Sequence, residues 1–138
     1  MPEHSAPALF DELTRCRPWI EAALEYTHGA HVWDDIVAGV YAGHFHLFAK
    51  PRGCVVLEIR QYPRKREMNV FLAGGELEEI LNNISELDAI AHRAGAEALT
   101  MGGRPGWGPV LSKNGWHKMP EVTMRREVCP ETMAAHRS

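Results

Sequence analysis

The chain has 138 residues, of which 45% are hydrophobic and 24% charged, and its formal net charge is -3. These values are typical of one globular domain with a buried core, and they exclude a largely disordered chain. The weak negative charge gives no electrostatic argument for binding nucleic acid or an anionic membrane surface. We therefore expect a single domain over residues 1–138, with frayed ends at about 1–7 and 130–138.

The cysteines indicate the redox environment. Cys16, Cys54 and Cys129 are odd in number and lack a CxxC spacing, so they predict neither a disulfide framework nor a zinc knuckle and favour a reducing compartment. No apolar run is long enough for a transmembrane helix. The first residues lack the charged-then-apolar order of a signal peptide. We expect a cytoplasmic protein.

The first part of the chain has helical periodicity. Apolar residues recur every three or four positions over Ala8–Arg15 and Pro18–Thr27, which predicts two helices, the second with proline in its first turn. A third helix is predicted over Trp33–Tyr41, because Gly43 is a suitable stop.

The periodicity then changes to two. His44–Lys50, Cys54–Tyr62 and Glu67–Ala73 alternate or are rich in β-branched residues, with proline-containing turns between them. Such short connections predict three neighbouring antiparallel strands, because a parallel pair needs a longer crossover.

The second half of the chain contains a crossover. An apolar stripe with acidic residues at its start predicts a long helix over Glu76–Ala94, and Ala96–Met101 predicts a strand parallel to the one before the helix. A short helix over Gly106–Asn114 and a last strand over His117–Val128 complete the order. The predicted fold is a three-layer α-β-α arrangement around a mixed, mostly antiparallel sheet.

Gly74 and Gly75 join the third strand to the long helix. Unpaired backbone N–H groups at the start of a helix can hold a phosphate. The alternative is that the glycines only permit a tight turn, and Glu76 at the same place disfavours an anion. Taken alone, these residues favour the turn.

The order of elements resembles the GCN5-related N-acetyltransferase (GNAT) superfamily. The features that carry the resemblance are the strand that ends in two glycines before a helix and the closing helix-Gly-Trp of Leu111–Trp116. The tracts Tyr62-Pro63-Arg64, Leu72-Ala73-Gly74-Gly75 and Gly103-Arg104-Pro105-Gly106-Trp107 are similar to those of small GNAT-like proteins from bacteriophages and prophages. The resemblance covers about residues 8–128.

The resemblance implies acetyl-CoA (or CoA) as co-substrate and an amine of unknown identity as acceptor. It implies that the co-substrate contacts the strand end and the following turn, namely Phe71, Leu72, Ala73, Gly74, Gly75, Glu76 and Leu77. The chain departs from the family pattern in two ways. Leu111 occupies the position of the tyrosine that protonates the leaving thiolate, and the pyrophosphate loop is shortened.

Two further residues are candidates for the chemistry. Glu58, in the middle of a strand, is the best candidate for a general base that takes the amine proton; the alternative is an exposed sheet residue. Arg104, in a glycine-rich loop, could bind a carboxylate or phosphate, or serve only solubility. The pairs His28/His31 and His44/His46 favour surface histidines over a metal site, so no metal is expected.

Two function classes therefore remain. The first is an acyl-CoA-dependent N-acyltransferase that transfers an acetyl group to an amine. The second is a catalytically inactive protein of the same fold, such as a phage structural or accessory protein. A long edge strand at the C-terminal end can pair with a partner, which also allows a homo-oligomer.

Overall fold

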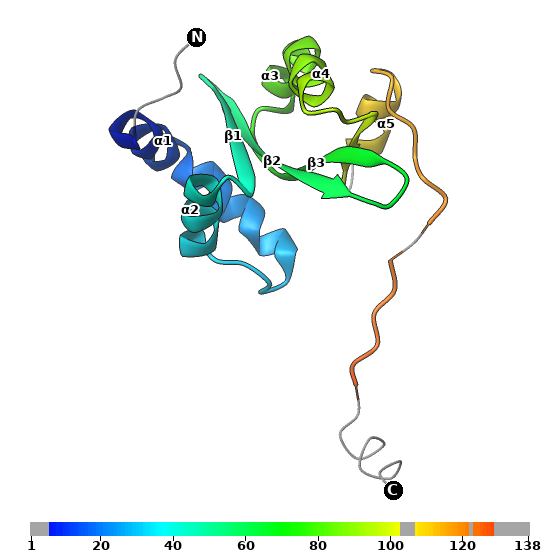
Figure 1. Cartoon of the computed structure of the whole chain (residues 1–138), viewed down its shortest axis with the longest axis horizontal. Helices are drawn as coiled ribbons and strands as arrows, with labels where there is room; N and C mark the ends of the chain where they lie inside the picture. The colour runs from blue at the N-terminus through cyan, green and yellow to red at the C-terminus, as the bar shows by residue number, and fades with distance from the viewer. Residues whose placement is uncertain (1–5, 103–106, 122, 129–138) are drawn as a thin grey trace, which may run out of the picture. The chain divides into compact units, whose positions relative to one another are not determined.

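The computed structural model describes residues 6–102, 107–121 and 123–128 of the chain. The chain divides into two compact units, Met1–Gly103 and Arg104–Ser138. The first unit holds the sheet and the helices that cover it, and the second holds one short helix (Figure 1). The expectation of a single domain over residues 1–138 stays a prediction.

The N-terminal helices are α1 (Ala6–Leu24), the 3-10 turn η1 (Glu25–Thr27) and α2 (Trp33–Ala42). The prediction of a break before Pro18 is wrong, because α1 continues through this proline. A proline inside a helix removes one hydrogen bond. Here Leu13 and Ile20, on either side of Pro18, are both buried in the same core, and packing of this kind outweighs local propensity. Within the described ranges no helix is long and apolar enough to cross a membrane.

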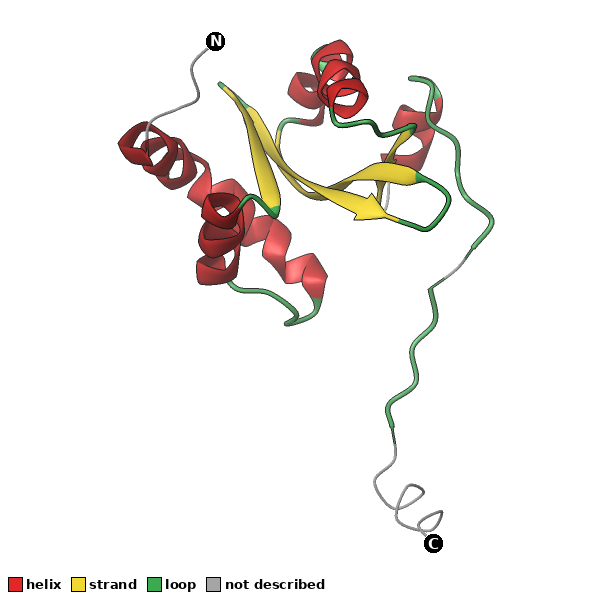
Figure 2. Cartoon of the chain, in the orientation of Figure 1, coloured by secondary structure: helices red, strands yellow, loops and turns green. Residues whose placement is uncertain are grey.

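The sheet has four strands in the order β1-β2-β3-β4. Figure 2 shows the strands in yellow and the helices in red. Their bounds are β1 Phe45–Lys50, β2 Gly53–Gln61, β3 Arg66–Gly75 and β4 Ala98–Met101. The first three strands pair antiparallel, and β4 pairs parallel with β3. Both the hairpin order and the parallel crossover predicted from the sequence are confirmed.

Helices cover both faces of the sheet. In Figure 1, α1 and α2 lie on one side, and the two helices of the crossover, α3 (Leu77–Asn82) and α4 (Ile84–Arg93), lie on the other. The core beneath α1 and α2 consists of Leu13, Cys16, Ile20, Ala23, Leu24, Ile36, Cys54, Val56 and Leu72. Successive strand residues point to opposite faces, so Val55 and Leu57, which are also buried, face the crossover. The predicted three-layer fold with a mixed sheet is confirmed.

The long helix predicted over Glu76–Ala94 is interrupted at Asn83, where φ is -112° and ψ is 20°. The Asn83 side-chain amide donates to the Glu79 carbonyl at 2.7 Å, which is how asparagine competes with helical hydrogen bonding. The predicted apolar stripe nevertheless persists across the break, because Ile80 and Leu87 are both buried.

The second unit contains α5 (Trp107–Ser112), which lies within the short helix predicted over Gly106–Asn114. The strand predicted over His117–Val128 is wrong, since its described residues form no strand. A strand requires a hydrogen-bonded neighbour, which the alternating sequence cannot supply by itself. Met124 is 88% exposed, and Arg125 pairs with Glu127 at 2.7 Å.

Candidate active site

Strands β3 and β4 run together for only part of their length. β4 pairs with Glu67 to Val70 of β3, whereas β3 continues to Gly75. β4 has therefore ended before the last residues of β3 are reached. The resemblance to the GNAT superfamily implies that the co-substrate lies at this strand end.

An irregularity in the ladder marks the point of separation. Val56 of β2 pairs with Leu72, and the next residue, Leu57, pairs with Val70. Phe71 is therefore the extra residue of a β-bulge. Bulges bend a strand and increase its twist. This bulge comes directly after Val70, the last residue of β3 that pairs with β4.

The predicted contact residues at this strand end offer mainly backbone. Leu72 and Ala73 are buried, with 5% and 8% of their surface exposed, and Leu72 belongs to the core beneath α1. Phe71 is partly buried and packs against the same core. Main-chain groups at a strand edge can pair with an extended ligand that contains amide groups, and pantetheine is such a ligand.

Gly74 and Gly75 have a structural role. A Cβ on Gly74 would lie 2.6 Å from Trp19 Cβ and 2.7 Å from Trp19 O, so glycine lets α1 approach the strand. Gly75 has a φ of 85°, and its Cβ would overlap the Arg52 carbonyl oxygen. These contacts support the turn interpretation. They also mean that a Gly75→Asp substitution would test folding as much as phosphate binding.

The start of α3, which includes Glu76 and Leu77, is occupied by protein groups. The Glu76 N–H donates to the Arg52 carbonyl at 2.9 Å. The Arg52 side chain lies 2.7 Å from Glu79 and 3.3 Å from Glu76, and the hydrogen bond with Glu79 raises the pKa of Arg52. Two carboxylates thus pair with one guanidinium, and Glu78 adds a third acidic residue in the first turn of α3. This charge disfavours a pyrophosphate.

Glu58 lies in a row of paired residues across the sheet. It faces Phe45 of β1 and Asn69 of β3, and Asn69 faces Thr100 of β4. Asn69 Nδ2 donates to Glu58 Oε1 at 3.0 Å, and Thr100 Oγ1 donates to Asn69 Oδ1 at 2.9 Å. Arg60 Nε donates to the same carboxylate oxygen at 3.3 Å. The row thus ends, on β4, one residue before the strand stops.

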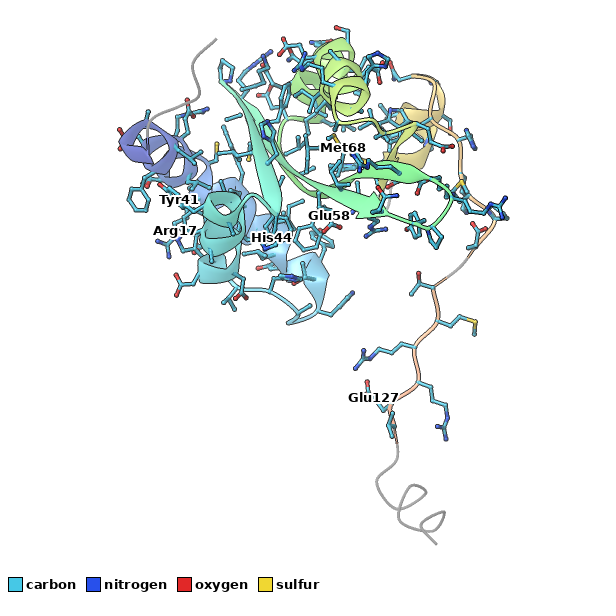
Figure 3. The ribbon with its side chains drawn as sticks, in the orientation of Figure 1. Arg17, Tyr41, His44, Glu58, Met68 and Glu127 are labelled. Atoms are coloured by element: carbon cyan, nitrogen blue, oxygen red, sulfur yellow. The ribbon has the colours of Figure 1, made fainter. Side chains whose placement is uncertain are left out.

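The Glu58 carboxylate points toward the helices of the N-terminal half. Figure 3 shows Glu58 on the α1 and α2 side of the sheet and Met68 on the opposite side. The side chain of Glu58 is 24% exposed, so it is neither a surface residue nor fully buried. A carboxylate that keeps some access can accept a proton from a bound amine, either directly or through water.

Aromatic rings adjoin this row. Phe45 stacks on Phe71 at 5.2 Å between ring centroids, and His31 meets Phe71 edge-on at 4.8 Å. Nδ1 of His31 is buried without a hydrogen-bond partner. His31 and Phe45 also line a shallow hollow of about 520 Å³ along α2, together with Asp35 and His44.

Other predicted site residues lie elsewhere. Arg104 lies outside the described residues, and so does most of its glycine-rich loop. Leu111, at the family's tyrosine position, is in α5 of the second unit. Among the residues that the structure describes, no group of three His, Cys, Asp or Glu side chains could hold a metal ion.

Asn69 and Thr100 were not predicted as site residues. Asn69 carries one available signal, because asparagine is depleted in strand interiors and this one is flanked by Met68 and Val70. Its link to Glu58 depends on register, which the bulge at Phe71 shifts. The sequence alone did not give that register.

Comparison with known proteins identifies the fold. No family model and no curated protein matches the chain. A probable acetyltransferase of known structure aligns with a TM-score of 0.61 at 10% identity, over 86% of this chain and 93% of its own. A GCN5-related N-acetyltransferase from Ralstonia eutropha gives 0.57 at 12% identity, over 84% and 93%. An aminoglycoside acetyltransferase from an uncultured soil sample, in complex with sisomicin, gives 0.56 at 12%, over 87% and 88%. The chain therefore has the GNAT fold.

Proposed function

We propose that this chain is an acyl-CoA-dependent N-acyltransferase that transfers an acetyl group to an amine. The observation that carries the proposal is the separation of β3 from β4 at Val70, with the Glu58 carboxylate on the row of residues next to it. The GNAT fold supports the reaction class, since several structures that share it are acetyltransferases. The fold alone does not specify chemistry, so the support for this particular reaction comes from the residues of the site.

In the proposed complex the pantetheine arm lies along β3 beyond Val70, and its amides pair with backbone groups of the segment from Phe71 to Ala73. The arm inserts where β4 has ended. The acyl carbonyl then lies near the bulge at Phe71, on the same side of the sheet as Glu58. Gly74, Gly75, Glu76 and Leu77 come next along the chain and would adjoin the pyrophosphate.

The proposed chemistry is direct transfer. The amine nitrogen attacks the thioester carbon, the C–N bond forms and the C–S bond breaks, and the nitrogen loses its proton to Glu58. CoA leaves as a thiolate and takes a proton from water, because the family's tyrosine position is Leu111. Arg104 is a candidate for binding an anionic group of either substrate.

The charge at the start of α3 implies weak binding of the nucleotide part. A pyrophosphate next to Glu76, Glu78 and Glu79 is repelled more than Arg52 alone can offset. S-acetylpantetheine, which lacks the pyrophosphate, should therefore bind almost as well as acetyl-CoA. A site that held the pyrophosphate would instead lose affinity when the nucleotide is removed, so this comparison is specific to the arrangement seen here.

The test measures thiol release from acetyl-CoA with a panel of primary amines and polyamines. Glu58→Gln should lower kcat by about 100-fold or more, the usual contribution of a general base, and should leave acetyl-CoA binding unchanged. Glu67→Gln is the matched control, because Glu67 is a carboxylate of the same sheet, on β3, and pairs with Arg60 two rows further from the strand separation. If neither acetyl-CoA nor S-acetylpantetheine raises the melting temperature at millimolar concentration, the protein is inactive and the proposal fails.

A further inference from the structure

Asn69 is conspicuous because it is a polar side chain in the centre of the sheet. It is 5% exposed and is one of two buried polar or charged residues among those the structure describes. It lies on β3, between Glu58 of β2 and Thr100 of β4, and bonds to both. A buried amide that bonds to a partner on each side can hold its neighbours in one geometry.

The direction of these bonds is determined by chemistry. An ionised carboxylate can only accept hydrogen bonds, so the amide must turn its Nδ2 toward Glu58. Its Oδ1 then faces β4, where the Thr100 hydroxyl donates to it at 2.9 Å. The reverse orientation would place Oδ1 against Glu58 Oε1, two acceptors about 3.0 Å apart. The Glu58 carboxylate therefore sets which way the amide faces, and the Thr100 hydroxyl satisfies the Oδ1 that this orientation leaves toward β4 and so anchors the amide that holds Glu58.

The bonds also select one oxygen of the carboxylate. Asn69 Nδ2 and Arg60 Nε both donate to Oε1, at 3.0 Å and 3.3 Å. No donor from the described part of the chain is found at Oε2. Oε2 is therefore the oxygen available to take a proton.

The position in the sheet links this row to the strand separation. Thr100 is the second-to-last residue of β4. Asn69 immediately precedes Val70, which is the last residue of β3 that pairs with β4. A ligand that enters where β3 and β4 part would lie next to the Thr100–Asn69 hydrogen bond. A change in that hydrogen bond would move the Asn69 amide and, through it, the Glu58 carboxylate.

The geometry points to Asn69, locked by Thr100, as a positioning residue that orients Glu58 for proton transfer. This inference rests on the proposed N-acyltransferase function. A purely structural role for the same hydrogen bonds would affect stability only. The two roles are separated by measuring how kcat and KM change in conservative variants.

The main variant is Thr100→Val, which keeps the shape of the side chain and removes its hydroxyl. It should lower kcat about 10- to 100-fold through misorientation of Glu58, with little change in KM for acetyl-CoA. Thr100→Ser restores the donor and should recover most of the activity. In a Glu58→Gln background Thr100→Val should cause no further loss, because both changes remove the same contribution. Equal losses in both backgrounds would overturn the inference.

A second measurement does not need turnover. The Asn69 side-chain amide protons should exchange slowly with solvent in the wild type, as observed by NMR, and at least 10-fold faster in Thr100→Val. Unchanged exchange would overturn the lock between Thr100 and Asn69. If the wild type binds acetyl-CoA but transfers no acetyl group, the proposed function fails, whereas this exchange comparison still decides whether Thr100 fixes Asn69.

Discussion

The close approach of α1 to β3 gives the sharpest stability prediction. In Gly74→Ala the new Cβ would start 2.6 Å from Trp19 Cβ and 2.7 Å from Trp19 O. Non-bonded carbon atoms prefer about 3.5–4.0 Å. Neither Trp19 atom lies at the end of a flexible side chain, so rotamer changes cannot relieve the contact. α1 itself has to move away from the sheet by close to an ångström.

The expected cost follows from this forced movement. Overpacking of a well-packed core destabilises by about 1–3 kcal/mol. With a urea m value of about 2 kcal/mol/M, a loss of about 2 kcal/mol lowers the denaturation midpoint by about 1 M. Gly102→Ala is the matched control, because a Cβ there meets nothing within 4 Å and its φ is not positive. It should change the midpoint by no more than about 0.25 M.

Urea denaturation followed by tryptophan fluorescence measures both variants. If Gly74→Ala keeps the wild-type midpoint, the account of this glycine as a packing residue is wrong. If it also loses acetyl-CoA binding while remaining stable, the glycine acts in ligand binding, which is the interpretation that the structure argues against.

Four more outcomes are expected. Pro18→Ala should raise the free energy of unfolding by about 1–2 kcal/mol in urea titrations, because it restores a helical donor; a loss of stability would contradict the account of α1. Leu87→Ala should destabilise by about 2–5 kcal/mol in the same assay, and a cost below about 1 kcal/mol would show that the α4 contact is loose. Glu76→Gln should tighten acetyl-CoA binding about 2- to 5-fold in calorimetry at low salt, the effect of removing one nearby charge, and the gain should shrink at high salt. The hydrogen bond with the Cys16 thiol, and then burial, raise the pKa of Cys54. In the Cys129→Ser variant Cys54 should therefore resist iodoacetamide at pH 8 until urea unfolds the protein, and fast labelling of Cys54 in the native state would refute this.

Much of the fold could be predicted from local pattern. The hairpin strands, the parallel crossover and the end of α2 at Gly43 each depend on residues close together in sequence. The errors have a different origin. α1 continues through Pro18 because a shared core holds both of its halves, and the long crossover helix breaks at Asn83 through a side-chain hydrogen bond. A regular strand predicted beyond His117 needs a partner that periodicity cannot identify.

The candidate site follows the same division. Glu58 could be proposed as a base because a carboxylate in a strand is a local signal. Its partners could not be found in this way, since Asn69 and Thr100 reach it only through the register of β2, β3 and β4. That register includes the extra residue Phe71, which shifts every later pairing by one position. The geometry of the site therefore depends on tertiary structure, although Glu58 itself could be proposed from the sequence.

The most direct test of the central claim is hydrogen–deuterium exchange of the backbone with and without millimolar acetyl-CoA. If the pantetheine arm pairs with β3 beyond Val70, exchange should slow in the Phe71–Ala73 segment, and S-acetylpantetheine should produce the same protection. Residues of β1, on the far edge of the sheet, should not change. Binding without protection of Phe71–Ala73, or protection confined to another element, would contradict the placement of the acyl donor between β3 and β4.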